Sequence, residues 1–164
     1  MKVIVLKGRG HIGKTATMKK VIEKLAAAPD ATGPHYRKSP YKVNPKCPND
    51  ETEKYDRLCS FCYKGKHVIV ATGGDIPESI REVLNICATR ENEGEKPVDV
   101  LLIPCRTKGD TLAVINELPD KIILDKLVVS GGTRAETWYE PVNEIDAERL
   151  LQTLNDLISD HSLI

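Results

Sequence analysis

A short glycine-rich stretch near the start of the chain ends in a lysine and a threonine. Residues 8–15 read GRGHIGKT and fit the pattern G-x-x-x-x-G-K-[ST]. In this pattern the glycines let backbone N–H groups turn inward around phosphate oxygens, the lysine reaches the β- and γ-phosphates, and the hydroxyl binds Mg²⁺. We therefore expect Lys14 and Thr15 to hold a nucleoside triphosphate together with Mg²⁺.

The residues on either side of this stretch have the patterns that a phosphate-binding loop requires. Residues 3–6 are apolar and mostly β-branched, which predicts a buried strand. After the loop, apolar residues recur at the spacing of one helix face, at Met18, Val21, Ile22 and Leu25. The N-terminus of that helix would add its partial positive charge at the position of the phosphates.

Residues 1–28 resemble the opening of a P-loop NTPase, because Gly8, Gly13, Lys14 and Thr15 match the Walker A pattern. The resemblance implies ATP and Mg²⁺ as ligands, and a compact domain like that of the small single-domain P-loop kinases and ATPases. The nucleotide-binding residues that it implies are Gly8, Gly10, His11, Ile12, Gly13, Lys14, Thr15 and Ala16. The GTPase branch is disfavoured, because no N-K-x-D motif follows a predicted strand.

Cleavage of a γ-phosphate also needs a carboxylate near Mg²⁺ and usually a cation that balances the charge of the transition state. Asp75 follows a predicted strand, so we expect it to organise Mg²⁺ or the attacking water. Alternatively, Asp75 caps the next helix together with Glu78. Arg106 and Arg134 follow later strands and are candidates for stabilising phosphate charge, although each could instead be an ordinary solvated loop cation.

Outside residues 30–66, predicted strands and helices alternate along the chain. We predict strands over residues 67–71, 98–103 and 127–129, helices over residues 76–87, 111–118 and 143–158, and a loop containing Trp138 and Tyr139. Strands that are apolar on both faces indicate an α/β fold, a parallel sheet with helices on both faces. Ligands bind such sheets at the carboxyl ends of the strands, which places the site among residues 8–15, 72–75, 104–110 and 131–134.

Residues 30–66 differ in composition from the rest of the chain. They are charged, show little apolar periodicity, and contain Pro34, Pro40, Pro45 and Pro48. We predict a small irregular lobe inserted into a single domain that spans residues 1–164. Residues 35–43 could form a short strand at a sheet edge, since Pro40 excludes a central position. In the small P-loop kinases an insertion of this kind holds the phosphoryl acceptor, so the resemblance implies an acceptor site here.

Cys59 and Cys62 form a C-x-x-C pair in the predicted lobe, with Cys47 before it and His67 after it. Three thiolates and an imidazole suit tetrahedral Zn²⁺, which would also stabilise a small proline-rich lobe. His35 is another candidate for the fourth ligand. Without zinc, the pair would be a free or redox-active dithiol.

The composition excludes several classes of protein. The chain has 164 residues, with 24 Lys+Arg and 24 Asp+Glu, so its charge gives no reason to expect binding to nucleic acid or to a membrane surface. It lacks a secretory h-region and any run of about 18 apolar residues, which predicts a soluble, cytoplasmic protein. Cys87 and Cys105 are expected to be small core residues.

These features predict an ATP-binding protein that acts as a Mg²⁺-dependent ATPase or as a small phosphotransferase. The alternative is a nucleotide-gated binding module, in which slow turnover changes the partners of the 30–66 lobe. The expected partners are the nucleoside triphosphate and an acceptor or partner protein. The sequence leaves open the choice between ATP and GTP, the identity of the acceptor and the oligomeric state.

Overall fold

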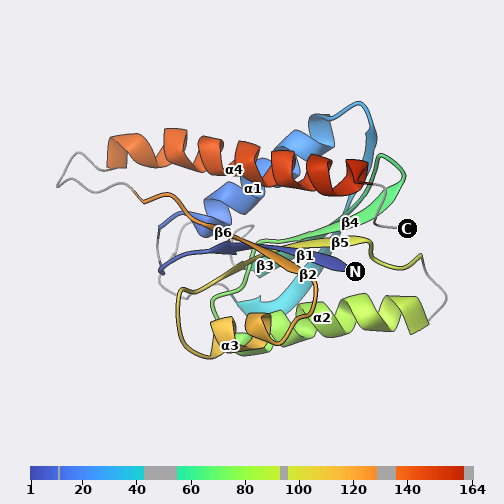
Figure 1. The fold of residues 1–164 in the computed structure, drawn as a ribbon, viewed down its shortest axis with the longest axis horizontal. Coiled ribbons are helices and arrows are strands. Elements are labelled where there is room, and N and C mark those ends of the chain that lie inside the picture. Colours follow the sequence, from blue (N-terminus) through green and yellow to red (C-terminus); the bar gives the residue numbers. More distant parts are fainter. Residues whose placement is uncertain (11, 43–54, 93–95, 129–135, 161–164) are drawn as a thin grey trace.

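The computed structural model describes residues 1–10, 12–42, 55–92, 96–128 and 136–160. These residues form six strands and four helices (Figure 1). The strands are β1 (Lys2–Lys7), β2 (Ala31–Lys42), β3 (Tyr55–Tyr63), β4 (Lys66–Ala71), β5 (Val100–Cys105) and β6 (Lys121–Asp125). The helices are α1 (Lys14–Ala27), α2 (Pro77–Asn92), α3 (Asp110–Asn116) and α4 (Glu136–Ser159).

All six strands belong to one sheet, in the order β2-β3-β4-β5-β1-β6. Strands β4, β5, β1 and β6 run parallel, whereas β3 is antiparallel to both β2 and β4. The sheet is therefore mixed, and the prediction of a parallel sheet is wrong because β3 runs against both of its neighbours. For the β3–β4 pair the cause is the tight turn at Lys64 and Gly65, both with positive φ, because such a turn can only return the chain antiparallel.

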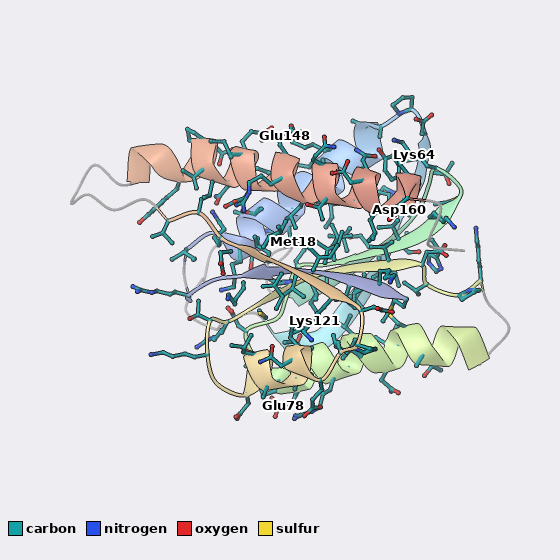
Figure 2. All side chains as sticks on the ribbon, in the orientation of Figure 1. Met18, Lys64, Glu78, Lys121, Glu148 and Asp160 are labelled. Carbon is teal, nitrogen blue, oxygen red and sulfur yellow. The ribbon has the colours of Figure 1, made fainter. Side chains whose placement is uncertain are left out.

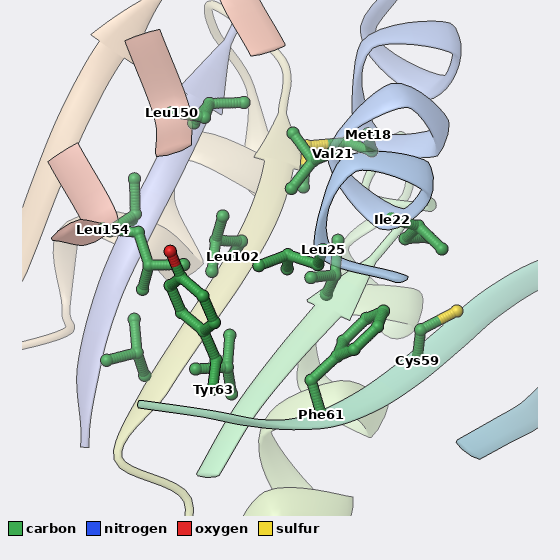
Figure 3. Close-up of a cluster of buried hydrophobic side chains, with 14 of the residues drawn as sticks. Met18, Val21, Ile22, Leu25, Cys59, Phe61, Tyr63, Leu102, Leu150 and Leu154 are labelled. Carbon is green, nitrogen blue, oxygen red and sulfur yellow. The ribbon is translucent and has the colours of Figure 1, made fainter. Parts of the chain in front are cut away.

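The prediction of an irregular lobe over residues 30–66 is also corrected, because its described residues form a hairpin that extends the main sheet. Cys59, Phe61 and Tyr63 alternate along β3 and point into the core, where all three are buried (Figure 3). The composition of this segment, rich in proline, predicted irregular structure, although its apolar residues alternate along β3. The predicted edge strand is confirmed, since β2 lies at one edge of the sheet, and residues 43–54 lie outside the described residues.

Two predictions for the last third of the chain are wrong. Of the strand predicted at residues 127–129, residues 127 and 128 are described and lie outside any strand. The edge strand is instead β6 at 121–125, because β1 pairs with β6 only as far as Lys7 and Asp125, where β1 ends. Trp138 and Tyr139 belong to α4 rather than to a loop, since this helix begins at Glu136.

Helices cover both faces of the sheet, as the sequence predicts. Side chains at alternate positions of β1 enter two separate cores: Ile4 packs in the cluster beneath α1 and α4, and Val5 packs in the cluster beneath α2 and α3. Met18 points from α1 toward the sheet, whereas Glu148 and Glu78 lie on the outer surfaces of the two helix layers (Figure 2). Among the described residues, no helix combines the length and the apolar character needed to cross a membrane.

Candidate functional site

The glycine loop, residues 8–13, connects the end of β1 to the start of α1. It is packed closely at both ends. A Cβ atom on Gly8 would lie 2.8 Å from Cβ of Lys126, while the Gly8 N–H donates to the carbonyl of Cys105 at 3.0 Å. Gly13 precedes α1 with a φ of 89°, in the left-handed region that favours glycine. These two positions therefore require glycine for reasons of space and backbone conformation.

Lys14 is the first residue of α1, and its side chain is 4% exposed. Its Nζ atom donates to the carbonyl of Arg9 at 2.5 Å and lies 3.3 Å from Oδ1 of Asp75. The ammonium group therefore folds back over the glycine loop, between the loop and the end of β4.

Residues from three strand ends meet at this loop. The Thr15 hydroxyl donates to the carbonyl of Thr72 at 3.3 Å, just past the end of β4. Nε of Arg106, just past β5, lies 3.6 Å from Oδ1 of Asp75, and these two side chains are 48% and 50% exposed. The structure thus brings Lys14, Thr15, Asp75 and Arg106 together, and the two cations exceed the one carboxylate in charge.

A close backbone contact brings Asp75 to Arg106, and sequence reasoning missed it. A Cβ atom on Gly74 would lie only 1.7 Å from the carbonyl oxygen of Pro104, so the chain after β4 rests directly on the end of β5. Only glycine allows this approach. The signal in the sequence was the Gly73-Gly74 pair that follows an apolar strand.

Cys105 is buried at the end of β5, as predicted, and its Sγ donates to the carbonyl of Arg106 at 3.3 Å. Burial raises the pKa of its thiol from 9.0 to about 11, although the positive charges of Lys14 and Lys7 act to lower this pKa. The thiol therefore stays protonated near neutral pH.

One buried polar residue of α4 contacts the glycine loop and a second pairs with a residue beside the loop, and sequence reasoning missed both. Asn143 lies against Gly13, and Asp146 pairs with Lys126 beside Gly8. No pattern pointed to them, because they are spaced among apolar residues on a helix far along the chain.

Of the proposed zinc ligands that the structure describes, Cys59 lies apart from Cys62 and His67. Cys59 is buried among the apolar side chains beneath α1, whereas Cys62 is exposed on the other face of β3. His67 of β4 is the register partner of Cys62, but its Nε2 lies 2.8 Å from the Ser60 hydroxyl and its Nδ1 lies 2.9 Å from the Lys96 carbonyl. Both ring nitrogens thus already have hydrogen-bonding partners.

Among the described residues, no group of three or more His, Cys, Asp or Glu side chains is arranged to hold a metal ion. Cys62 and His67 instead border a cavity of about 330 Å³ that is also lined by His35. This cavity lies near the start of β4, at the end of the sheet opposite the glycine loop. The arrangement separates the cysteine pair from the predicted nucleotide site.

Three predicted site residues, His11, Cys47 and Arg134, lie outside the described residues, as does the segment 131–134. Comparisons of the chain with protein-family models, with curated proteins and with solved structures found no match.

Proposed function

We propose that the protein binds a nucleoside triphosphate with Mg²⁺ at the glycine loop and cleaves its γ-phosphoryl group, with ATP as the expected nucleotide. One observation carries this proposal. Lys14, Asp75 and Arg106 come from three segments that are far apart in the sequence. Nζ of Lys14 and Nε of Arg106 nevertheless both lie within 3.6 Å of Oδ1 of Asp75, beside the loop. Parallel strands direct their carboxyl ends to one edge, where ligands of such sheets bind.

The residues beside the loop suit the triphosphate and its metal. The start of α1 offers unpaired N–H groups and a partial positive charge to phosphate oxygens. Lys14 would leave the Arg9 carbonyl and Asp75 to reach the phosphates, and Arg106 would balance negative charge at the exposed side of the site. The oxygens of Thr15 and Asp75 are the kind of ligand that Mg²⁺ prefers.

The proposed reaction is hydrolysis or transfer of the γ-phosphoryl group. When bound, Mg²⁺ would neutralise charge that develops on that group. Asp75 would orient either the metal or the attacking oxygen, and Lys14 would hold the phosphates in line with it. A cytoplasmic location would supply both ATP and Mg²⁺.

The test is calorimetric titration of ATP and GTP, with and without Mg²⁺, into the wild type, Lys14→Ala and Lys24→Ala, with phosphate release followed in parallel. Removing a buried charged partner should weaken Mg·ATP binding at least about 30-fold in Lys14→Ala. Lys24 lies further along α1 and pairs with Glu148 at the surface, so Lys24→Ala controls for the loss of a helix lysine.

Binding that disappears only in Lys14→Ala, with measurable phosphate release, supports the proposal. Binding without phosphate release would contradict catalysis and favour the alternative function, a nucleotide-gated binding module. A folded wild type that binds neither nucleotide would overturn the proposal altogether.

A further inference from the structure

Helix α4 contacts the glycine loop at Gly13, through the side chain of Asn143. We propose that Asn143 of α4 is a positioning residue, which holds Gly13 and the first turn of α1 so that Lys14 and Thr15 face the nucleotide. This inference rests on the proposed function, because it assigns to Asn143 an effect on nucleotide binding.

Asn143 is one of the few polar side chains in the buried layer between α1 and α4, and it is 4% exposed. Its amide group lies against Gly13. A Cβ atom on Gly13 would lie 2.5 Å from Oδ1 and 2.9 Å from Nδ2 of Asn143. Any larger residue at position 13 would push the amide away, and any displacement of the amide would open space behind the loop.

A hydrogen-bonded chain extends this contact into α1. The hydroxyl of the fully buried Thr17 lies 2.9 Å from the carbonyl of Gly13 and 3.2 Å from Oδ1 of Asn143. A hydroxyl has one hydrogen and can donate it to only one of these acceptors. With the amide turned by half a rotation, Nδ2 donates to the hydroxyl, which donates to Gly13, and all three groups are satisfied.

The position of α4 is itself fixed beside the other end of the loop. The fully buried carboxylate of Asp146 accepts hydrogen bonds from Nζ of Lys126 at 2.8 Å and from the backbone N–H of Leu127 at 3.1 Å. The N–H of Lys126 donates to the carbonyl of Lys7, directly before Gly8. Helix α4 therefore contacts Gly13 directly through Asn143, and it is joined to the chain just before Gly8 through Asp146 and Lys126.

Directional hydrogen bonds explain why a polar residue is useful at this buried position. An apolar side chain could fill the same volume, but it would not specify one orientation of the first turn. Lys14 and Thr15 belong to that turn, and a displacement of about 1 Å in a site of this kind can cost about 100-fold in rate. We therefore expect loss of Asn143 to weaken nucleotide binding without any direct contact to the nucleotide.

The test compares Asn143→Ala with Asn155→Ala on the same helix. Asn155 accepts hydrogen bonds from Tyr63 at 2.9 Å and from Lys64 at 2.8 Å, at the far end of α4 from the loop. Both variants lose an asparagine that joins α4 to the rest of the protein. Asn143→Ala should weaken Mg·ATP binding about 10-fold, or ~1.4 kcal/mol, while Asn155→Ala should stay within about 2-fold of the wild type.

A second variant, Thr17→Val, removes the hydroxyl while keeping the shape of the side chain. If Asn143→Ala does not fold, Thr17→Val provides the test instead. It should weaken binding as Asn143→Ala does, and the double variant should lose little more than either single one. Wild-type affinity in folded Asn143→Ala, or an equal loss in Asn155→Ala, would overturn the inference. If the wild type binds no nucleotide, the proposed function fails first, so the two failures are distinguishable.

Discussion

The parallel part of the sheet and the β2–β3 hairpin differ in whether the polar side chains predicted to form a site lie together. At the parallel strand ends, Lys14, Asp75 and Arg106 come from distant segments and meet beside the glycine loop. In the hairpin, Cys59 and Cys62 are close in the sequence, yet one is buried in the core and the other is exposed.

The difference has a simple geometric cause. Parallel strands all end at the same edge of a sheet, so the residues that follow them converge whatever their separation along the chain. Within a strand, successive side chains alternate between faces, so the two cysteines of a C-x-x-C pair point in opposite directions. A C-x-x-C pair suits a shared metal when it forms a turn, and β3 places this one in a strand.

The largest effect is expected from breaking the close contact at the parallel end. Gly74→Ala would place a Cβ atom 1.7 Å from the backbone carbonyl of Pro104, which cannot be relieved by a side-chain movement. We expect a loss of at least about 4 kcal/mol in the free energy of unfolding, or no folded protein. Denaturant unfolding of the wild type and the variant measures this difference in free energy.

Gly10→Ala is the matched control for this substitution. A Cβ atom there has nothing within 4 Å, so its free energy of unfolding should stay within about 0.5 kcal/mol of the wild type. Equal stabilities of the two variants would mean that the chain after β4 does not rest on β5.

The next effect tests whether the hairpin belongs to the core. Phe61 is 1% exposed in the cluster beneath α1, so Phe61→Ala should lower the free energy of unfolding by about 3–5 kcal/mol. Cys62 follows it on the opposite, exposed face, and Cys62→Ala should change that free energy by less than about 0.5 kcal/mol. If Cys62→Ala proved the more damaging variant, an irregular lobe held by its cysteines would be the better description.

The smallest effect concerns the thiol at the end of β5. Because burial raises the pKa of Cys105 from 9.0 to about 11, the unfolded chain releases this proton at lower pH than the native protein does. Above pH 9.0 ionisation of the thiol therefore stabilises the unfolded state. The free energy of unfolding falls with rising pH until the folded thiol also ionises near pH 11.

Stability curves of the wild type and Cys105→Ala, measured by thermal unfolding between pH 7 and pH 11, isolate this contribution from other groups. The difference between them should be constant at neutral pH and should move in favour of the variant above about pH 9. A difference that does not change with pH would show that the thiol has an ordinary pKa.

Local patterns in the sequence were sufficient for the elements around the glycine loop. The apolar strand, the glycines and the helical spacing from Met18 to Leu25 predict β1, the loop and α1 within one or two residues of where they lie. These signals are local because backbone conformation at glycine and the period of apolar residues act over a few neighbours. The cover of helices on both faces of the sheet followed from strands that are apolar on both faces.

Strand partners and convergent contacts were decided only by the tertiary structure. Whether residues 121–125 or 127–129 form the edge strand depends on where β1 ends, and that depends on a partner distant in the sequence. The contacts of Asn143 with Gly13 and of Gly74 with Pro104 likewise join segments that no local pattern links. The sequence by itself determined which residues form the predicted phosphate-binding loop. The packing of α4 and β5 against the loop determined where those residues are held, because such packing depends on distances between residues that are remote along the chain.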